Sequence, residues 1–313
     1  MNIFNEFKFN SISELFMTFS NEQKCIDYLE KIIWNGNPVS PFDKDSKVYK
    51  CANNQYRCKN TGKYFNVKKN TIFEGTKISL QKWFVVIWFF VSHKGGLSSL
   101  QLQRDLGLTQ KSTWYILHKI KHNCLFENKH ILDNEVEIDE TYVGGKNKNR
   151  HHDKKVPRAQ GRSYKDKTPV LGMIERGGKV VARVVSSVDA DCLVPIVLRT
   201  INAFSTVYTD EWGAYNDLHK YYEHYIVNHS RKEYVNGTAT TNSIENFWGN
   251  LKRGIIGIYR VVSKKHLQRY VNEFVFKRNT MKLKTCEQFN HFMSNLSGYR
   301  ITQREIKGVY IVL

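Results

Sequence analysis

The order of strand and helix patterns in the second half of this 313-residue chain limits its fold more than any other feature. Residues 135–143 are predicted to form one strand, and residues 169–174 and 180–185 two more, joined across Arg176-Gly177-Gly178. Helices and strands then alternate, with a helix over 193–201, a strand over 206–209, a helix over 212–220, a strand over 225–227 and a helix from about residue 242. Three consecutive strands followed by this alternation predict a mixed α/β sheet.

The first 80 residues are short segments separated by turn signals. Residues 56–67 predict two short strands around the turn Asn60-Thr61-Gly62, which together form a hairpin. Residues 83–91 (WFVVIWFFV) are the longest apolar run and predict a buried helix. That run is too short to span a bilayer.

Two helical patterns over 97–121 are separated by Gly107. In the second pattern apolar residues recur at helical spacing, while Lys111, Lys119 and Lys121 occupy polar positions. Two short helices joined by a glycine-containing turn predict a helix-turn-helix that binds DNA. The same pattern also fits an ordinary helical hairpin that does not touch DNA.

The charge of the chain favours a nucleic acid as its partner. Lys and Arg number 48 against 29 Asp and Glu, so the net charge is 48 − 29 = +19. An excess of this size repels itself unless a polyanion neutralises it, which places nucleic acid above a membrane surface. Six scattered cysteines do not resemble a disulfide framework, and the N-terminus lacks the features of a signal peptide. We therefore expect a cytoplasmic, DNA-associated protein with no membrane partner.

Acidic residues recur at every second position of the strand predicted over 135–143. Glu135, Glu137 and Asp139 then share one face of the strand, where like charges need a compensating cation. This pattern indicates a functional acidic face. It also fits an exposed edge strand whose carboxylates are solvated.

Asp210 is the second acidic candidate. It follows a short apolar strand, and open α/β sheets build their sites at the carboxyl ends of strands. A helix N-cap is an equally good interpretation, because Asp is a preferred capping residue.

The helix predicted from residue 242 carries a third candidate. Asn242, Glu245 and Lys252 lie on one polar stripe, with Glu245 and Lys252 about 10 Å apart along the axis. A carboxylate and an amine so placed suit a metal ion and a phosphate. A capping box with Asn242 as N-cap explains the first two residues without catalysis. The adjoining apolar stripe contains Ile244, Phe247, Trp248, Leu251 and Ile255.

Taken together, the three acids favour metal-assisted phosphodiester chemistry. Two divalent metals bound side by side need several converging carboxylates, and Mg²⁺ accepts carboxylates, waters and substrate phosphates as ligands. This half of the sequence contains no zinc-binding spacing of His or Cys and no phosphate-binding Gly-x-x-x-x-Gly-Lys loop. We therefore expect no use of ATP.

Three runs of sequence carry a family resemblance: 136–145 (VEIDETYVGG), 208–212 (YTDEW) and 241–254 (TNSIENFWGNLKRG). With residues 266–270 and 273–274, this ordered set resembles the insertion-sequence transposases of the ISXO-two-like group. The likeness extends over nearly the whole chain from about residue 20. It implies a DDE-type catalytic domain with a ribonuclease-H-like fold.

The resemblance also implies roles for single residues. Asp139, Asp210 and Glu245 correspond to the catalytic, metal-binding acids, which hold two Mg²⁺ or Mn²⁺ ions. The third acid is described in this group as either a glutamate or an asparagine, so Asn242 is an alternative to Glu245. We prefer Glu245 because a carboxylate neutralises a divalent ion and an amide does not. Lys252 is expected to contact DNA phosphate near the cut.

Relatives in this group carry an N-terminal zinc ribbon with two Cys-x-x-Cys pairs, and this sequence departs from it. Ser40 and Asp43 stand where the first pair is expected, and Thr61 replaces the partner of Cys58. One thiolate without partners cannot close a tetrahedral site. We expect a ribbon-shaped fold without structural zinc.

A strongly basic stretch follows the predicted acidic strand. Residues 146–167 contain nine Lys or Arg against two Asp, which gives +7 in 22 residues. Such a stretch suits the DNA backbone close to the catalytic acids, although a solvated loop is also compatible with it. The residues predicted to contact DNA are Lys111, Lys119, Lys146, Lys148, Arg150, Lys154, Lys155 and Arg253.

The sequence thus predicts a DNA transposase. It is expected to bind the terminal inverted repeats of its element, cleave the DNA ends and join the 3′-OH ends to target DNA as a homodimer or larger assembly. The alternatives are a catalytically inactive DNA-binding copy or regulator, and a ribonuclease-H-like nuclease that joins no ends. The expected segments are a ribbon-like region with the buried helix (1–95), a helix-turn-helix (96–127), a catalytic domain (130–285) and a C-terminal tail (286–313).

Overall fold

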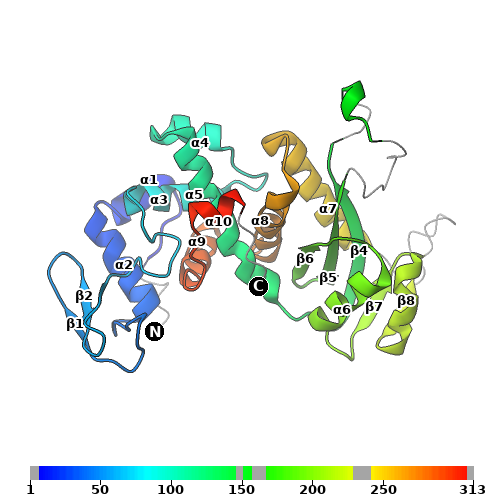
Figure 1. The fold of residues 1–313 in the computed structure, drawn as a ribbon, viewed down its shortest axis with the longest axis horizontal. Helices are drawn as coiled ribbons and strands as arrows, with labels where there is room; N and C mark the ends of the chain where they lie inside the picture. Colours follow the sequence, from blue (N-terminus) through cyan, green and yellow to red (C-terminus); the bar gives the residue numbers. More distant parts are fainter. Residues whose placement is uncertain (1–6, 146–150, 157–166, 228–240, 309–313) are drawn as a thin grey trace. The chain divides into compact units, whose positions relative to one another are not determined.

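The computed structural model describes residues 7–145, 151–156, 167–227 and 241–308 (Figure 1). The chain divides into two compact units. Met1–Asn123 and Lys282–Leu313 form the first unit, and Cys124–Met281 forms the second. Among the described residues, no helix is both long enough and apolar enough to cross a membrane.

A five-stranded sheet in the order β6-β5-β4-β7-β8 organises the second unit. The first three strands in sequence pair antiparallel, and a short turn joins β5 to β6. In contrast, β7 runs parallel to β4, and β8 runs parallel to β7. The prediction of a mixed α/β sheet is therefore confirmed. The strands are β4 (Glu135–Val143), β5 (Thr168–Glu175), β6 (Val180–Val184), β7 (Thr206–Thr209) and β8 (Glu223–Ile226).

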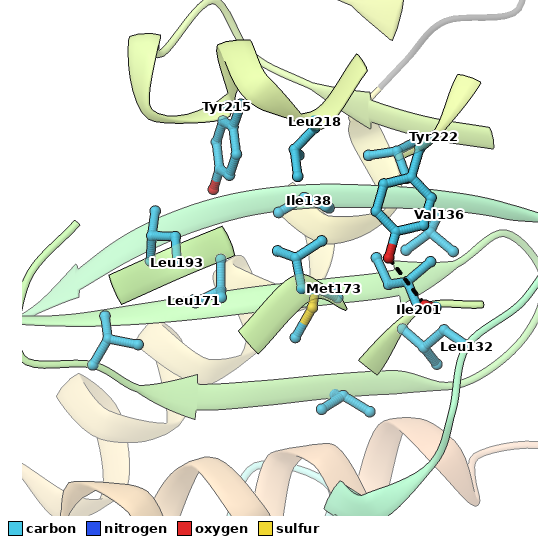
Figure 2. Close-up of a cluster of buried hydrophobic side chains, with 14 of the residues drawn as sticks. Leu132, Val136, Ile138, Leu171, Met173, Leu193, Ile201, Tyr215, Leu218 and Tyr222 are labelled. Carbon is cyan, nitrogen blue, oxygen red and sulfur yellow. Dashed lines mark hydrogen bonds between the residues drawn. The ribbon is translucent and has the colours of Figure 1, made fainter. Parts of the chain in front are cut away.

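One face of this sheet is covered by α6 (Ala190–Thr200) and the 3₁₀ helix η5 (Gly213–Lys220). Figure 2 shows the buried cluster between the sheet and these two helices. In this cluster the Tyr222 hydroxyl donates a hydrogen bond to the Ile201 carbonyl at 3.0 Å. The segment over 212–220 was expected to be a helix and is present as 3₁₀ turns. Side chains of the cluster include Val136, Ile138, Leu171, Met173, Leu193, Tyr215 and Leu218.

The opposite face packs against α7 (Asn242–Gly254) and α8 (Leu267–Asn279). Val170, Val180 and Ala182 of the sheet meet the apolar stripe of α7 there. Because side chains alternate along a strand, Val136 and Ile138 of β4 face α6, while Glu137 and Asp139 face α7. On the acidic face of β4, Glu137 is therefore buried against α7, while Glu135 and Asp139 are partly buried. The strand lies between β5 and β7 and is not an exposed edge.

The sheet ends at β6, whose outer side is covered by amide side chains. Asn128 donates to the Ala182 carbonyl at 2.6 Å and accepts from the Ala182 amide at 2.8 Å. Gln268 and Asn279 accept hydrogen bonds from the amides of Val184 and Val180. These groups satisfy an edge that would otherwise pair with another strand. The unit also contains η2 (Cys124–Lys129), η4 (His152–Lys154), the π-helical η7 (Ile255–Tyr259) and η8 (Lys264–His266).

The first unit is mainly helical and has an aromatic core. Edge-to-face contacts link Phe19, Tyr28, Phe84 and Phe289, with ring centroids 4.9–5.7 Å apart. The expected buried helix is present as α3. The elements of this unit are α1 (Ile12–Thr18), α2 (Glu22–Trp34), β1 (Val48–Lys50), β2 (Tyr56–Cys58), β3 (Tyr64–Phe65), α3 (Leu80–Ser92), α4 (Ser99–Leu106), α5 (Gln110–Asn123), α9 (Thr285–Ser294) and α10 (Gln303–Lys307).

The segment expected as a tail from residue 286 has a different arrangement. Helix α9 brings Phe289 and Phe292 into the interior of the first unit, and Asn290 accepts a hydrogen bond from the buried Tyr28 hydroxyl at 2.6 Å. The apolar side chains of this short helix are three and four residues apart, which gives it one buried face. Of the described residues after 281, those over 285–294 and 303–307 therefore form helices that belong to the same unit as residues 7–123.

Candidate active site

The neighbouring parallel strands β4 and β7 place two of the predicted acids side by side. Glu137 pairs with Tyr208 in the sheet register, so two residues further along each strand Asp139 comes level with Asp210. Asp210 directly follows β7, and its Oδ1 accepts a hydrogen bond from the Trp212 amide at 3.0 Å. This bond turns the chain into η5. Asp210 thus lies at the carboxyl end of a strand, where an open sheet presents its site.

Glu137 fixes the start of the helix that carries the third acid. Its Oε2 accepts hydrogen bonds from the amides of Ser243 and Ile244 at 2.9 and 3.0 Å, and its side chain is 1% exposed. The carboxylate therefore satisfies two unpaired amides at the positive end of α7. The N-cap residue is Thr241, which makes no side-chain capping bond. The alternative of a capping box between Asn242 and Glu245 is not what the structure contains.

Arg176 supplies the cation that the acidic face of β4 requires. Its guanidinium pairs with Glu135 and, at 3.2 Å, with Glu137, and it lies 3.9 Å from the centre of the Tyr208 ring. Burial opposes its charge, yet the hydrogen bonds that it donates to the two carboxylates raise the pKa of Arg176 above its ordinary value. The arginine places one positive charge beside the two acids that precede Asp139 along the strand.

Trp248 reaches from α7 to the first predicted acid. Its indole Nε1 donates a hydrogen bond to Asp139 Oδ2 at 2.9 Å. Gly172 lies opposite Asp139 in the sheet, and a Cβ atom at this glycine would be 2.4 Å from Trp248 Cζ2 and 2.8 Å from Ile244 Cδ1. The absence of a side chain at Gly172 therefore permits the close approach of α7 on which the Trp248–Asp139 bond depends.

A cavity of about 450 Å³ opens at this end of the sheet. It brings together Asp139, Asp210 and Glu245 from three separate elements, and Lys252 lies on its wall. Asn242 does not line it, which leaves Glu245 as the side chain of α7 with a carboxylate in the cavity. The lining consists of Asp139, Glu140, Thr141, Tyr142, Lys167, Asp210, Thr241, Glu245, Trp248, Gly249 and Lys252.

The negative charge of the cavity affects the pKa of Tyr215. Its buried hydroxyl donates a hydrogen bond to Glu140. Burial first, and then the carboxylates of Glu140, Asp139 and Asp210, raise the pKa of Tyr215 well above its ordinary value. The tyrosine therefore stays protonated and remains a donor to Glu140 across the physiological pH range.

The donor set of the cavity fits a hard divalent cation. Carboxylate oxygens, completed by water and phosphate oxygens, are the ligands that Mg²⁺ prefers. Within the described part of the chain, no group of three or more His, Cys, Asp or Glu side chains is close enough together to hold a metal ion. Asp139, Asp210 and Glu245 line the same cavity, but they do not form such a group in this structure.

Comparison with known proteins identifies the family. Residues 131–279, which include the whole sheet and α7, match the model of the ISXO2-like transposase domain. The chain is also 30% identical over 108 residues to an uncharacterized transposase-like protein of Haemophilus influenzae, a match that covers 34% of this chain and 86% of that protein. The chain belongs to the ISXO2-like transposases.

A second relative spans most of this transposase. It is described as an uncharacterized protein in transposable element ISH50 of Halobacterium salinarum, and it is 26% identical over 279 residues, covering 85% of this chain and 93% of the relative. Among solved structures, the Mos1 strand transfer complex aligns over 70% of this chain and 79% of that chain, with 12% identity and a TM-score of 0.28. A TM-score this low does not establish a shared fold.

One of the predicted DNA-contacting lysines of this transposase is buried, so that prediction is wrong. Lys119 is 2% exposed, and its ammonium donates hydrogen bonds to the carbonyls of Ile72 and Glu74 at 2.7 and 3.3 Å. It also lies over the rings of Trp83 and Tyr115, and burial lowers the pKa of Lys119 to about 8. A lysine on a helical pattern is normally assigned to solvent, and only these distant partners explain its burial.

The other predicted DNA contacts stay predictions. Lys111, Lys155 and Arg253 are exposed. Lys146, Lys148 and Arg150 lie outside the described residues, as does the side chain of Lys154. Lys111 lies near the start of α5, which follows α4 after a turn in which Gly107 adopts a left-handed conformation with φ of 61°.

The ribbon-like region of the transposase is held by hydrogen bonds at the positions where the family resemblance led us to look for zinc ligands. The Cys58 thiol donates to Ser46 Oγ at 3.2 Å, and Asn60 donates to an Asp43 carboxylate oxygen at 2.8 Å. Ser40 Oγ accepts from the Asp43 amide, which keeps a tight turn at the first ligand position. Polar side chains thus occupy this part of the ribbon, which is a three-stranded sheet of β1, β2 and β3.

Sequence reasoning missed two residues that build this site. Trp248 was assigned only to an apolar stripe, although a buried tryptophan needs an acceptor for its indole N–H and a carboxylate is a strong one. Glu137 was grouped with the acidic face, although a buried carboxylate must find donors. In both cases residue type and burial signalled a polar partner, but the partner lies more than a hundred residues away.

Proposed function

We propose that this ISXO2-like transposase cuts and joins DNA ends in the cavity at the end of β4. The observation that carries the proposal is the meeting of Asp139, Asp210, Glu245 and Lys252, from three separate elements, on one cavity wall. The mixed sheet with helices on both faces supports the assignment of a ribonuclease-H-like catalytic domain. The excess of positive charge supports DNA as the substrate.

Asp139, Asp210 and Glu245 are the residues that would hold the two divalent ions, Mg²⁺ or Mn²⁺. When bound, such ions activate the attacking oxygen and neutralise charge on the leaving oxygen of an in-line displacement. Trp248 fixes the orientation of the Asp139 carboxylate, and Glu137 fixes the start of the helix that presents Glu245. Lys252, two turns further along α7, contacts a phosphate of the DNA entering the cavity.

The reaction consists of two displacements at phosphorus. In the first, a water oxygen bonds to the scissile phosphorus at the end of the element and the 3′ oxygen leaves, taking up a proton. In the second, the resulting 3′-hydroxyl bonds to a phosphorus of target DNA, and the target's own 3′ oxygen leaves. No bond between protein and DNA is formed in either step.

The terminal inverted repeats are bound outside this cavity. We assign their recognition to the pair of helices α4 and α5, with Lys111 at its exposed face. Lys155, Arg253 and the basic stretch after Gly145 contact the DNA backbone. Because two ends must be joined together, the active form is a dimer or larger assembly on DNA.

Acid-to-amide variants test the catalytic assignment. Asp139→Asn, Asp210→Asn and Glu245→Gln should each abolish Mg²⁺-dependent cleavage of a terminal-repeat duplex while binding of that duplex persists. Glu211→Gln is the matched control, because Glu211 neighbours Asp210 but does not line the cavity. Asn242→Ala should retain cleavage, which separates it from Glu245 as the third residue.

Two results would overturn the proposal. Cleavage that survives in Asp139→Asn or Asp210→Asn would remove these acids from the reaction. A wild-type protein that binds the repeat but never cuts it, with Mg²⁺ or with Mn²⁺, would instead indicate an inactive DNA-binding copy. Pre-cut ends supplied with a target plasmid test the joining step separately.

A further inference from the structure

The segment that joins α7 to α8 presents aliphatic side chains to solvent. Ile256, Ile258 and Val261 are 67%, 41% and 86% exposed, and we call these three residues the apolar ridge. Neighbouring residues hold the ridge against the core. Ile255 is buried in the core between α7, α8 and the sheet, and Tyr259 packs against the same core. The exposure therefore belongs to an ordered part of the second unit.

The backbone of this segment is strained. Helix α7 runs directly into the π-helical turn η7, a form that is rare and concentrated at functional sites. Arg260 then adopts φ 62° and ψ −59°, and the Val261 amide donates to the Tyr259 carbonyl at 2.7 Å. These values define the uncommon γ-turn with positive φ.

A buried group holds the strained turn in place. The Tyr259 hydroxyl donates to both carboxylate oxygens of Glu273 at 2.8 Å, and Lys277 pairs with Glu273 at 3.4 Å. Strained conformations persist only where their surroundings determine them, and they are commonest at functional sites. Here the turn projects Val261 outward instead of folding it onto the core.

The surroundings of the apolar ridge carry only positive charge along the chain. Between Glu245 and Glu273 the sequence contains no Asp or Glu and six Lys or Arg. A second copy of this surface would therefore meet it with like charge, whereas a polyanion is complementary to it. The basic residues are Lys252, Arg253, Arg260, Lys264, Lys265 and Arg269.

We propose that the apolar ridge inserts between base pairs of the duplex DNA that enters the cavity. Aliphatic wedges flanked by basic side chains unstack a base step and kink the duplex. Lys252, which lines the cavity, and Arg253 lie at the end of α7 that leads into the ridge, so the kink would occur close to the reacting phosphodiester. Flexible pyrimidine–purine steps, which unstack most easily, are the preferred sequence. The proposal rests on the proposed function for the identity of the DNA.

The test uses the full-length protein and a duplex with 2-aminopurine placed at a TA step. Wild type should increase the fluorescence of the probe as the base unstacks, and Ile256→Ser with Val261→Ser should lose this increase. Phe204→Ser is the matched control, because Phe204 is a fully exposed apolar residue of the same unit outside the ridge. Unfolding midpoints of both variants should equal that of wild type, since only exposed side chains change.

A pre-weakened duplex separates insertion from simple contact. The ridge variant should bind a fully paired duplex several-fold more weakly than wild type, and the difference should shrink on a duplex with a mismatch at the step. Asp139→Asn should keep the fluorescence increase, so failure of the catalytic assignment leaves this readout intact. Equal fluorescence in wild type and the ridge variant would overturn the proposal. So would a wild-type dimer, formed without DNA, that the ridge variant converts to monomers.

Discussion

Gly172→Ala tests the packing that brings α7 against the sheet. In a strand interior, alanine normally stabilises a protein by about 0.5–1 kcal/mol relative to glycine. Here the new methyl would lie 2.4 and 2.6 Å from two Trp248 ring atoms and 2.8 Å from Ile244 Cδ1. All three atoms belong to buried side chains, so neither neighbour can simply swing into solvent. Overpacking of this kind costs about 1–3 kcal/mol and outweighs the gain.

The displaced indole should also lose its hydrogen bond to Asp139. A bond to a charged acceptor contributes about 1.5–3 kcal/mol, so the full penalty reaches several kcal/mol if the indole moves away. We expect the free energy of unfolding to fall by at least 1 kcal/mol, which lowers the melting temperature by about 2–4 °C per kcal/mol in a unit of this size. Cleavage should weaken further than stability alone explains, because Asp139 is no longer oriented.

Denaturant unfolding followed by tryptophan fluorescence measures the first effect, and cleavage of a terminal-repeat duplex at saturating protein measures the second. Gly213→Ala is the control, since a methyl there meets only the Asn216 side chain at 3.9 Å. Trp248→Phe combined with Gly172→Ala should be less damaging than the sum of the two single changes, because the smaller ring leaves room for the methyl. A Gly172→Ala protein as stable and as active as wild type would refute the close packing.

Three further predictions concern other residues. Glu137→Gln should lower the free energy of unfolding by roughly 3–5 kcal/mol, because it breaks the buried pair with Arg176. Glu135→Gln changes the more exposed partner of Arg176 and should lower it by about 0–1 kcal/mol. Burial, with Arg269 and Lys265 nearby, lowers the pKa of His266 from 6.5 to about 4, so the folded state favours the neutral ring. The stability that His266 contributes should be complete above pH 6.5 and disappear as the pH falls towards 4. The urea midpoint of His266→Gln should therefore fall less than that of wild type over this range. Lys111→Ala should weaken binding to any duplex and reduce the slope of log binding constant against log salt concentration by about one. Lys24 of α2 is also exposed, and Lys24→Ala should change neither quantity.

Local patterns were sufficient for the strands of the second unit and for the helices α6 and α7. The strand predicted over 135–143 is β4 (Glu135–Val143), and the helix expected from about residue 242 is α7. Both are strongly patterned segments, one by alternation and the other by an apolar stripe. The family motifs then pointed to the three acids that line one cavity, although the residues are separated by up to about a hundred positions.

Local patterns failed where a side chain finds its partner across the fold. Lys119 occupies a helical position that periodicity assigns to solvent, and only the carbonyls of Ile72 and Glu74 explain its burial. Glu137 belongs to a run of three acids, yet its hydrogen-bond donors come from the start of α7. Such pairings depend on which elements pack together, and a single sequence carries no direct signal of that.

Helix α7 connects three unusual local features of this molecule to its proposed chemistry. A buried carboxylate holds its first turn, a glycine in the sheet admits its tryptophan, and its last turn runs into a strained segment with exposed aliphatic side chains. The strained segment with its exposed side chains departs from what stability alone favours, and such departures concentrate at functional sites. Along the same helix Glu245 and Lys252 line the cavity. One rigid element therefore fixes the distance between Glu245, the proposed third catalytic acid, and the proposed kink in the DNA. For that reason, an insertion of one residue between Lys252 and Ile256 should uncouple cutting from DNA bending without abolishing either.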